Sequence, residues 1–315
     1  MTTENSSVLS ELPDLASARI GGKVLSANDE FFAPKENLLK PGKAVFVEGK
    51  YTSRGKWMDG WETRRRRTPG FDWCIVRLGL RGIIRGVNVD TSHFLGNYPE
   101  HCSIEACDGL GAPWIEILPK SPLKGGSDNV FGIQNAQAWT HVRLNIYPDG
   151  GVARLRVYGD AVLDVAKLVK AGRPVDLAAA LNGGWVVESS NKFFGAPSNM
   201  LMPGRAKNMG DGWETRRRRG PGYDWAIVRL GVPGTLEEIE VDTNHFKGNY
   251  PDRLSLEGSR SMEQWAEILP ETKLKPHKRH FFKKEIRSAG PFGFVRINIF
   301  PDGGISRLRI YGRPA

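Results

Sequence analysis

Cysteine is scarce in this chain, which has only Cys74, Cys102 and Cys107 among 315 residues. An odd, small number of cysteines argues against a secreted disulfide framework and is typical of a reducing cytosol. Long apolar runs are also missing, since no stretch approaches the ~18 residues that a membrane helix needs. Residues 1–22 are acidic and polar and lack the apolar segment of a signal peptide. We therefore expect a cytoplasmic protein without a membrane partner.

Negative charge is in deficit, with 35 acidic residues against 45 Lys and Arg, so the formal net charge is +10. Such a surplus attracts anions of every kind, including nucleic acids, membrane surfaces and small acids, and does not choose among them. The 37 glycines and 20 prolines lie between short apolar runs. This distribution is typical of a turn-rich β protein.

The chain contains an internal sequence repeat. Residues 59–67, DGWETRRRR, return unchanged as residues 211–219. The strings VDT-x-HF-x-GNYP at 89–99, W-x-EILP at 114–119 and VR-x-NI-x-PDGG-x-x-RLR-x-YG at 142–159 return in the same order. Because both order and spacing are kept, we infer that one ancestral domain was duplicated.

The repeat divides the chain into three parts. We predict a first repeat at 1–159 and a second at 175–315, each a β-sandwich. The linker 160–174 has apolar spacing that predicts a short helix. The first repeat carries about ten extra residues between Asn37 and Asp59, which predicts a longer loop there.

Short β-rich runs alternate with turn signals inside each copy. The runs that predict strands in the first copy are residues 74–78, 83–89, 115–118, 142–147 and 152–158. Many short strands and few helices favour an antiparallel sandwich. We predict an all-β fold of two tandem jelly-roll β-sandwich domains.

Two features resemble the galactose-binding-like sandwich: the Asp-Gly…Thr element at 59–63, and a strand that ends in Leu-Gly before a valine-rich strand, at 73–89. That likeness concerns the fold alone, since these sandwiches serve as binding modules as well as enzymes.

The longer strings, taken together and in order from Gly21 to Gly312, closely resemble the allantoicase family. The resemblance implies hydrolysis of allantoate to ureidoglycolate and urea, a step in purine breakdown. It also implies a tandem jelly-roll fold and homo-oligomers.

The implied substrate sets the requirements for a site. Allantoate is a carboxylate whose α carbon bears two ureido groups, and urea leaves well only when it is protonated. A site therefore needs a cation for the carboxylate, a general acid, a general base for water, and amide-type partners for the ureido groups.

The segment from Glu62 to Arg67 could supply much of this. If it is extended, Glu62, Arg64 and Arg66 share one face, and arginine suits a two-pronged contact with a carboxylate. An exposed basic run that only solubilises the protein is the alternative. The counterparts in the second copy are Glu214, Arg216 and Arg218.

A second group of candidates follows the valine-rich strand. Asp90 and His93 would lie at a strand end, where His can act as acid, base or metal ligand. The alternative is a loop histidine that bonds its own turn. Asn97 is a further candidate, as a partner for a ureido group. The counterparts in the second copy are Asp242, His245 and Asn249.

No cofactor is evident and no metal motif is present, although a divalent ion held by Asp, Glu and His stays open. Two other functions also stay open: a non-catalytic carbohydrate or anionic-ligand binding protein, and a nucleic-acid binder that uses the arginine runs. No recognition helix, zinc finger or aromatic RNA-binding pattern occurs. We therefore expect a small-molecule substrate and no nucleic-acid partner.

Overall fold

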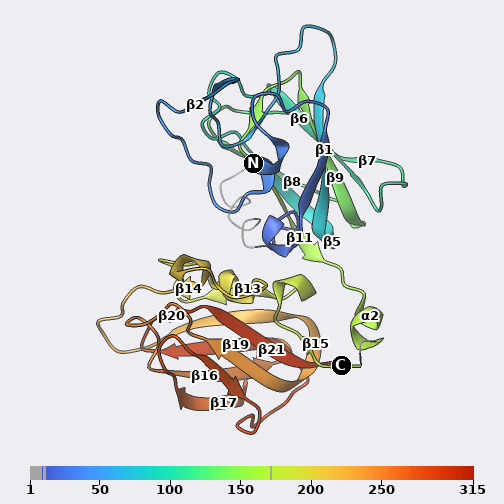
Figure 1. The fold of residues 1–315 in the computed structure, drawn as a ribbon. Coiled ribbons are helices and arrows are strands. Elements are labelled where there is room, and N and C mark those ends of the chain that lie inside the picture. Colours follow the sequence, from blue (N-terminus) through green and yellow to red (C-terminus); the bar gives the residue numbers. More distant parts are fainter. Residues whose placement is uncertain (1–8, 10–11, 171) are drawn as a thin grey trace. The chain divides into compact units, whose positions relative to one another are not determined.

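The computed structural model describes residue 9, residues 12–170 and residues 172–315 (Figure 1). The predicted start of the first repeat at residue 1 lies outside these residues. The chain separates into two compact units, one ending at Val162 and the other beginning at Leu163. The short helix α2 (Val165–Lys170) falls inside the segment expected to link the repeats.

One long strand organises the first unit. β5 (Asp72–Asp90) pairs through its first part with β1 (Lys23–Ala27) and β9 (Ala138–Tyr147). Its second part pairs with β11 (Arg154–Ala161) and β8 (Asp128–Gly132). The same strand therefore has two sets of partners and ties them together in one seven-stranded sheet.

The remaining strands of the first unit are short or peripheral. β6 (His101–Cys107) lies between β9 and β7 (Ile115–Pro122). Two small ribbons complete the unit: β10 (Gly151–Val152) with β4 (Trp61–Glu62), and β2 (Tyr51–Thr52) with β3 (Gly55–Lys56). Its 3₁₀ helices are η1 (Ala18–Ile20) and η2 (Lys35–Leu39).

The second unit repeats this arrangement around β15 (Asp224–Asp242). Its strands are β12 (Val175–Asp176), β13 (Trp185–Ser189), β14 (Trp213–Glu214), β16 (Arg253–Ser259), β17 (Ala266–Lys273), β18 (Arg279–Phe282), β19 (Phe292–Phe300), β20 (Gly304–Ile305) and β21 (Arg307–Pro314). Its 3₁₀ helices are η3 (Ala180–Asn182), η4 (Pro197–Leu201) and η5 (Met209–Asp211). The predicted fold class, two tandem all-β sandwiches, is confirmed.

The prediction of two separate strands at 74–78 and 83–89 was wrong, because β5 is continuous. Gly79 lies in its middle, and a Cβ there would come within 2.6 Å of the Ile20 carbonyl oxygen. The glycine is therefore needed for the close approach of two backbones. It does not mark a turn.

The cores are closed by large side chains. Trp61, Trp139 and Trp213 are fully or almost fully buried, as are Phe94 and Phe246. All three cysteines are free and buried. Among the described residues, no helix is both long enough and apolar enough to cross a membrane.

The extra residues of the first repeat contain the β2–β3 hairpin and are tied to the sandwich by a buried ion pair. The Arg154 guanidinium lies 2.5 Å from the Asp59 carboxylate. The same carboxylate accepts hydrogen bonds from the Val45 backbone N–H at 3.1 Å and from the Lys40 ammonium at 3.0 Å. A single buried aspartate thus fixes both ends of this loop to β11.

The close packing of Gly151 against Phe94 predicts that a larger side chain at Gly151 destabilises the protein. An added Cβ on Gly151 would lie 2.0 Å from the ring of Phe94, which is itself buried. We expect Gly151→Ala to destabilise the protein by about 1–3 kcal/mol, the usual cost of overpacking. Gly111→Ala, where nothing lies within 4 Å of the added atom, is the matched control. Equal thermal melting of the two variants would contradict this packing.

Candidate functional site

A cavity of about 340 Å³ in the first repeat gathers three predicted site residues from two of the repeated strings. Glu62, His93 and Asn97 all line it. The other lining residues are Phe32, Gly55, Lys56, Met58, Leu95 and Gly96. A carboxyl, an imidazole and an amide, separated in sequence, therefore face one small space.

Glu62 is placed in this cavity by the short strand β4. Its backbone is held on both sides, by Ala33 through hydrogen bonds in both directions and by Gly151 of β10. The side chain is half-buried, and the Asn97 amide donates to its Oε1 at 2.6 Å. Burial raises the pKa of the Glu62 carboxyl, and the hydrogen bond from Asn97 partly opposes this rise. The carboxyl therefore keeps its proton to higher pH than an exposed glutamate does.

The residues next to Glu62 in the repeated string hold the backbone. The buried Trp61 donates its indole N–H to the Asp29 carbonyl at 2.8 Å. The Thr63 hydroxyl accepts from the Gly150 backbone N–H at 3.1 Å. Glu62 is the member of the string that lines the cavity, which separates its role from that of its neighbours.

The arginines of the string are engaged elsewhere in their own repeat. β4 ends at Glu62, and the expected shared face of Glu62, Arg64 and Arg66 does not appear at the cavity. Arg64 contacts the Asp29 carboxylate at 2.7 Å, and Arg66 contacts Asp72 at 2.7 Å. Neither guanidinium lines the cavity of Glu62. These ion pairs anchor the segment after Glu62.

His93 has an unusual backbone that turns its ring into the cavity. Its φ is +70°, a left-handed conformation that costs a non-glycine residue of order 1–3 kcal/mol. The ring Nε2 lies 3.2 Å from the Ala44 carbonyl oxygen. Because a carbonyl can only accept, Nε2 carries the hydrogen, and Nδ1 of the neutral ring keeps its lone pair. In its neutral form, His93 bonded in this way can accept a proton at Nδ1.

The rest of the DT-x-HF string explains how this strained residue is held. The Asp90 carboxylate accepts from the Ser92 backbone N–H at 2.7 Å. The Thr91 hydroxyl donates to the Lys124 carbonyl at 2.5 Å, and Phe94 is buried in the core. These contacts fix the residues on both sides of His93.

Asp90 itself lies apart from Glu62. It lines a different cavity, of about 390 Å³, together with Asn88, Asp128, Arg154 and Tyr158. The sequence placed Asp90 and His93 at one strand end, and the structure sends their side chains to two different cavities. Asp90 is not among the residues that line the cavity of Glu62.

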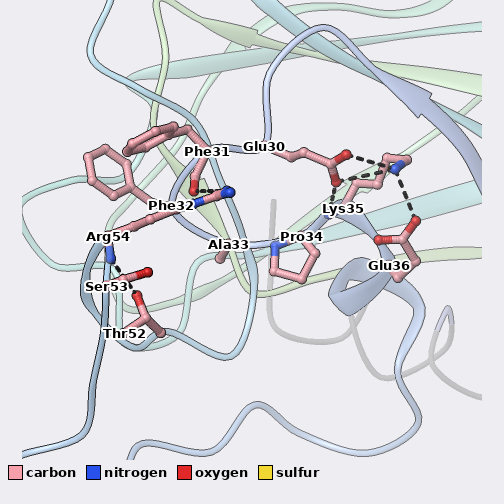
Figure 2. A pocket seen from close by; sticks show the side chains of 10 residues that line it. All are labelled: Glu30, Phe31, Phe32, Ala33, Pro34, Lys35, Glu36, Thr52, Ser53 and Arg54. Atoms are coloured by element: carbon pink, nitrogen blue, oxygen red, sulfur yellow. Dashed lines mark hydrogen bonds and ion pairs between the residues drawn. The ribbon is translucent and has the colours of Figure 1, made fainter.

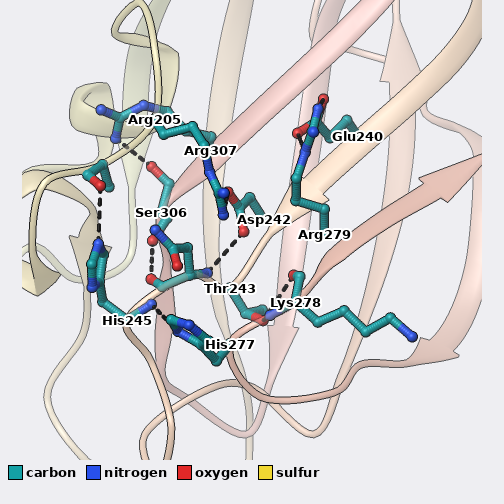
Figure 3. A network of polar contacts seen from close by, with 12 residues as sticks. Arg205, Glu240, Asp242, Thr243, His245, His277, Lys278, Arg279, Ser306 and Arg307 are labelled. Carbon is teal, nitrogen blue, oxygen red and sulfur yellow. Dashed lines mark hydrogen bonds and ion pairs between the residues drawn. The ribbon is translucent and has the colours of Figure 1, made fainter.

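The second repeat reproduces the central contact. The Asn249 amide donates to Glu214 Oε1, and His245 again has a φ of +70° with Nε2 at 2.9 Å from a carbonyl, that of Ala206. The His245 backbone N–H donates to Nδ1 of His277 at 2.9 Å (Figure 3). The carboxyl–amide pair and the strained histidine are thus common to both repeats.

The other second-repeat candidates also have local partners. Asp242 accepts from the Asn244 backbone N–H at 2.9 Å and lies 3.7 Å from the Arg205 guanidinium (Figure 3). Arg218 pairs with Asp224 at 2.7 Å, as Arg66 does with Asp72. Arg216 differs from Arg64, because Asn191 stands at the position of Asp29. Its guanidinium lies 4.1 Å from the centre of the Phe193 ring instead.

Several lining residues were not predicted from the sequence. Gly55, Lys56 and Met58 lie in the extra loop just before the repeated string, and Phe32 lies upstream of that loop. The extra length of the first repeat was the available signal. Within the described ranges, no three His, Cys, Asp or Glu side chains are close enough to hold a metal ion.

The fold and the paired polar groups define a class: a duplicated β-sandwich protein whose two repeats carry the same carboxyl, amide and imidazole constellation. A sequence model of the allantoicase repeat matches residues 13–162 and 175–315. The chain belongs to the allantoicase family, and the resemblance seen in the sequence is confirmed.

Individual relatives agree over nearly the whole chain. A protein named probable allantoicase 1, from Burkholderia mallei, is 52% identical over 95% of this chain and 94% of its own. A probable allantoicase from Ralstonia nicotianae is 50% identical, with the same coverage. The crystal structure of allantoicase from Saccharomyces cerevisiae matches with a TM-score of 0.86 at 34% identity, over 99% of this chain and 98% of the yeast chain.

The hydrogen bond between Asn97 and Glu62 makes a prediction about protonation. The amide stabilises the ionised carboxylate, so Asn97→Ala should raise the pKa of Glu62 further. A carbon-detected NMR titration of labelled glutamate side chains should show its midpoint moving to higher pH. Asn135→Ala, a change outside the cavity lining, is the control. An unchanged or lower midpoint in Asn97→Ala would show that the amide does not act on this carboxyl.

Proposed function

We propose that this chain hydrolyses allantoate to ureidoglycolate and urea, and that each repeat does so at its carboxyl–amide–imidazole constellation. The observation that carries the proposal is Glu62, a half-buried carboxyl with a raised pKa that lines one cavity with His93 and Asn97. Membership of the allantoicase family supplies the substrate class. The proposed residues are Glu62, His93 and Asn97, with Glu214, His245 and Asn249 in the second repeat.

In the proposed reaction, protonated Glu62 acts as the general acid. It gives its proton to the nitrogen of one ureido group as the bond from that nitrogen to the α carbon breaks, so that neutral urea leaves. His93 accepts a proton from water at Nδ1, and the water oxygen bonds to the same carbon. The products are urea and ureidoglycolate, and before the next turnover His93 releases the proton that it took from water while Glu62 takes one up from solvent.

Asn97 has two tasks in this scheme. Its N–H group holds the Glu62 carboxyl in place, and its amide oxygen can accept an N–H from the ureido group that stays on the product. Asp90 and the paired arginines act outside the reaction, as supports of the backbone. No metal is required by this chemistry.

The alternative functions have less support. A non-catalytic binding protein for carbohydrate or other anionic ligands would not need a carboxyl with a raised pKa. A nucleic-acid binder would need its arginines free for phosphates, whereas Arg64 and Arg66 are engaged with Asp29 and Asp72. A cytoplasmic location, homo-oligomers, and the absence of nucleic-acid and membrane partners stay predictions.

Urea release from allantoate tests the proposal. We expect Glu62→Gln/Glu214→Gln to lose at least about 100-fold in kcat, as for the loss of a general acid. Each single variant should keep the activity of its unaltered repeat. The two single variants should differ in kcat, because in the second repeat Asn249 also contacts the Met209 sulfur. Glu116→Gln, an exposed position on β7, is the matched control.

Thermal melting of each variant separates lost chemistry from lost folding. If the unaltered protein releases no urea, with or without added divalent metal ions, the proposed function is wrong. If the folded double variant stays fully active, the acid must be another residue.

A further inference from the structure

We infer that the two repeats bind the carboxylate of the substrate with lysines from different loops, Lys56 in the first repeat and Lys247 in the second. The inference rests on the proposed function, because it assumes an anionic substrate in the Glu62 cavity and its counterpart. It assigns a charged contact that the repeated strings themselves do not supply.

The repeated arginines leave this contact unfilled. Arg64 and Arg66 are paired with Asp29 and Asp72 and do not line the cavity. Among the lining residues, Lys56 is the only lysine or arginine. An anion that enters the cavity of Glu62 therefore meets a single permanent positive charge.

Lys56 has no carboxylate partner in the described part of the chain. Its Nζ lies 4.5 Å from the centre of the Phe46 ring. Phe46 in turn stacks on His93, with 5.8 Å between ring centres. The ammonium group and the imidazole that we propose as the base thus contact the same phenyl ring and line the same cavity, and the lysine charge is available to a ligand.

The hairpin that carries Lys56 is held in position. Arg54 donates from Nη1 to the Phe31 carbonyl at 2.9 Å, and its guanidinium lies 5.0 Å from the centre of the Phe31 ring (Figure 2). Lys50 lies over the Trp57 ring at 3.8 Å. The first contact joins β2–β3 to Phe31, and the second closes the base of the hairpin, so the lysine is placed by the fold.

The second repeat lacks this hairpin, and its charge comes from another place. The extra residues between Asn37 and Asp59 have no equivalent between Asn199 and Asp211. However, Leu95, which lines the first cavity, is replaced by the exposed Lys247. At these two aligned positions each repeat therefore has one lysine: Lys56 with Leu95 in the first, and Asn208 with Lys247 in the second.

The test uses proteins in which one repeat is silenced. In the Glu214→Gln background, Lys56→Gln should raise KM for allantoate by about 10-fold or more, as expected for loss of one charged contact, with a smaller effect on kcat. In the Glu62→Gln background, Lys247→Gln should do the same. Lys56→Arg keeps the charge and should restore most of the affinity.

Controls come from lysines in the same loops. Lys43→Gln removes an exposed charge from the same extra loop, and Lys207→Gln removes one from the loop before Asp211 in the second repeat. Neither change should alter KM by more than about two-fold, since neither removes a proposed charged contact. A general effect of net charge would instead appear in every variant and would overturn the inference.

The outcomes separate this inference from the proposed function. If urea is released but Lys56→Gln keeps the KM of its parent, the inference is wrong and the proposed function stands. The same holds for Lys247→Gln in its own background. If the unaltered protein releases no urea, the proposed function fails and this inference with it.

Discussion

A buried tryptophan decides where the key carboxyl lies. Trp61 has no exposed surface and donates its indole N–H to Asp29, so its side chain is fixed on the core side of β4. Side chains alternate along a strand, and the next residue, Glu62, must therefore turn to the opposite side. There it meets Asn97. Trp213 and Glu214 repeat this arrangement, with the indole bonded to Asn191. The chemistry proposed for each repeat depends on this one alternation.

The imidazole is positioned by a different and costlier means. His93 and His245 share a left-handed backbone that few non-glycine residues adopt. Strain of this kind persists only where the surroundings enforce it, and it is concentrated at functional sites. Buried Phe94 and Phe246, each packed against a glycine of the facing strand, supply that enforcement. The same cost in both repeats favours a shared role for the two histidines.

Much of this could be predicted from the sequence. The duplicated strings predicted two domains and carried the family resemblance, and the short strands with turn signals predicted that each domain is a β-sandwich. Glu62, His93 and Asn97 were identified as candidates because they recur with their neighbours. The partners of the arginines could not be predicted, since Asp29 lies 35 residues from Arg64 and has no carboxylate counterpart in the second repeat. Lys56 could not be predicted for a similar reason. It lies in a loop that is not repeated, so a comparison of the two copies does not identify it.

The central claim is that a protonated Glu62 drives the departure of urea, and the pH dependence of a single-repeat protein tests it most directly. In Glu214→Gln, kcat and the infrared carbonyl band of the protonated Glu62 carboxyl can be followed across the same pH series. Because burial raises the pKa of this carboxyl, the band should persist above the usual glutamate range. The account predicts that kcat and the band fall together as the pH rises. A rate that stays constant or increases while the band disappears would contradict it.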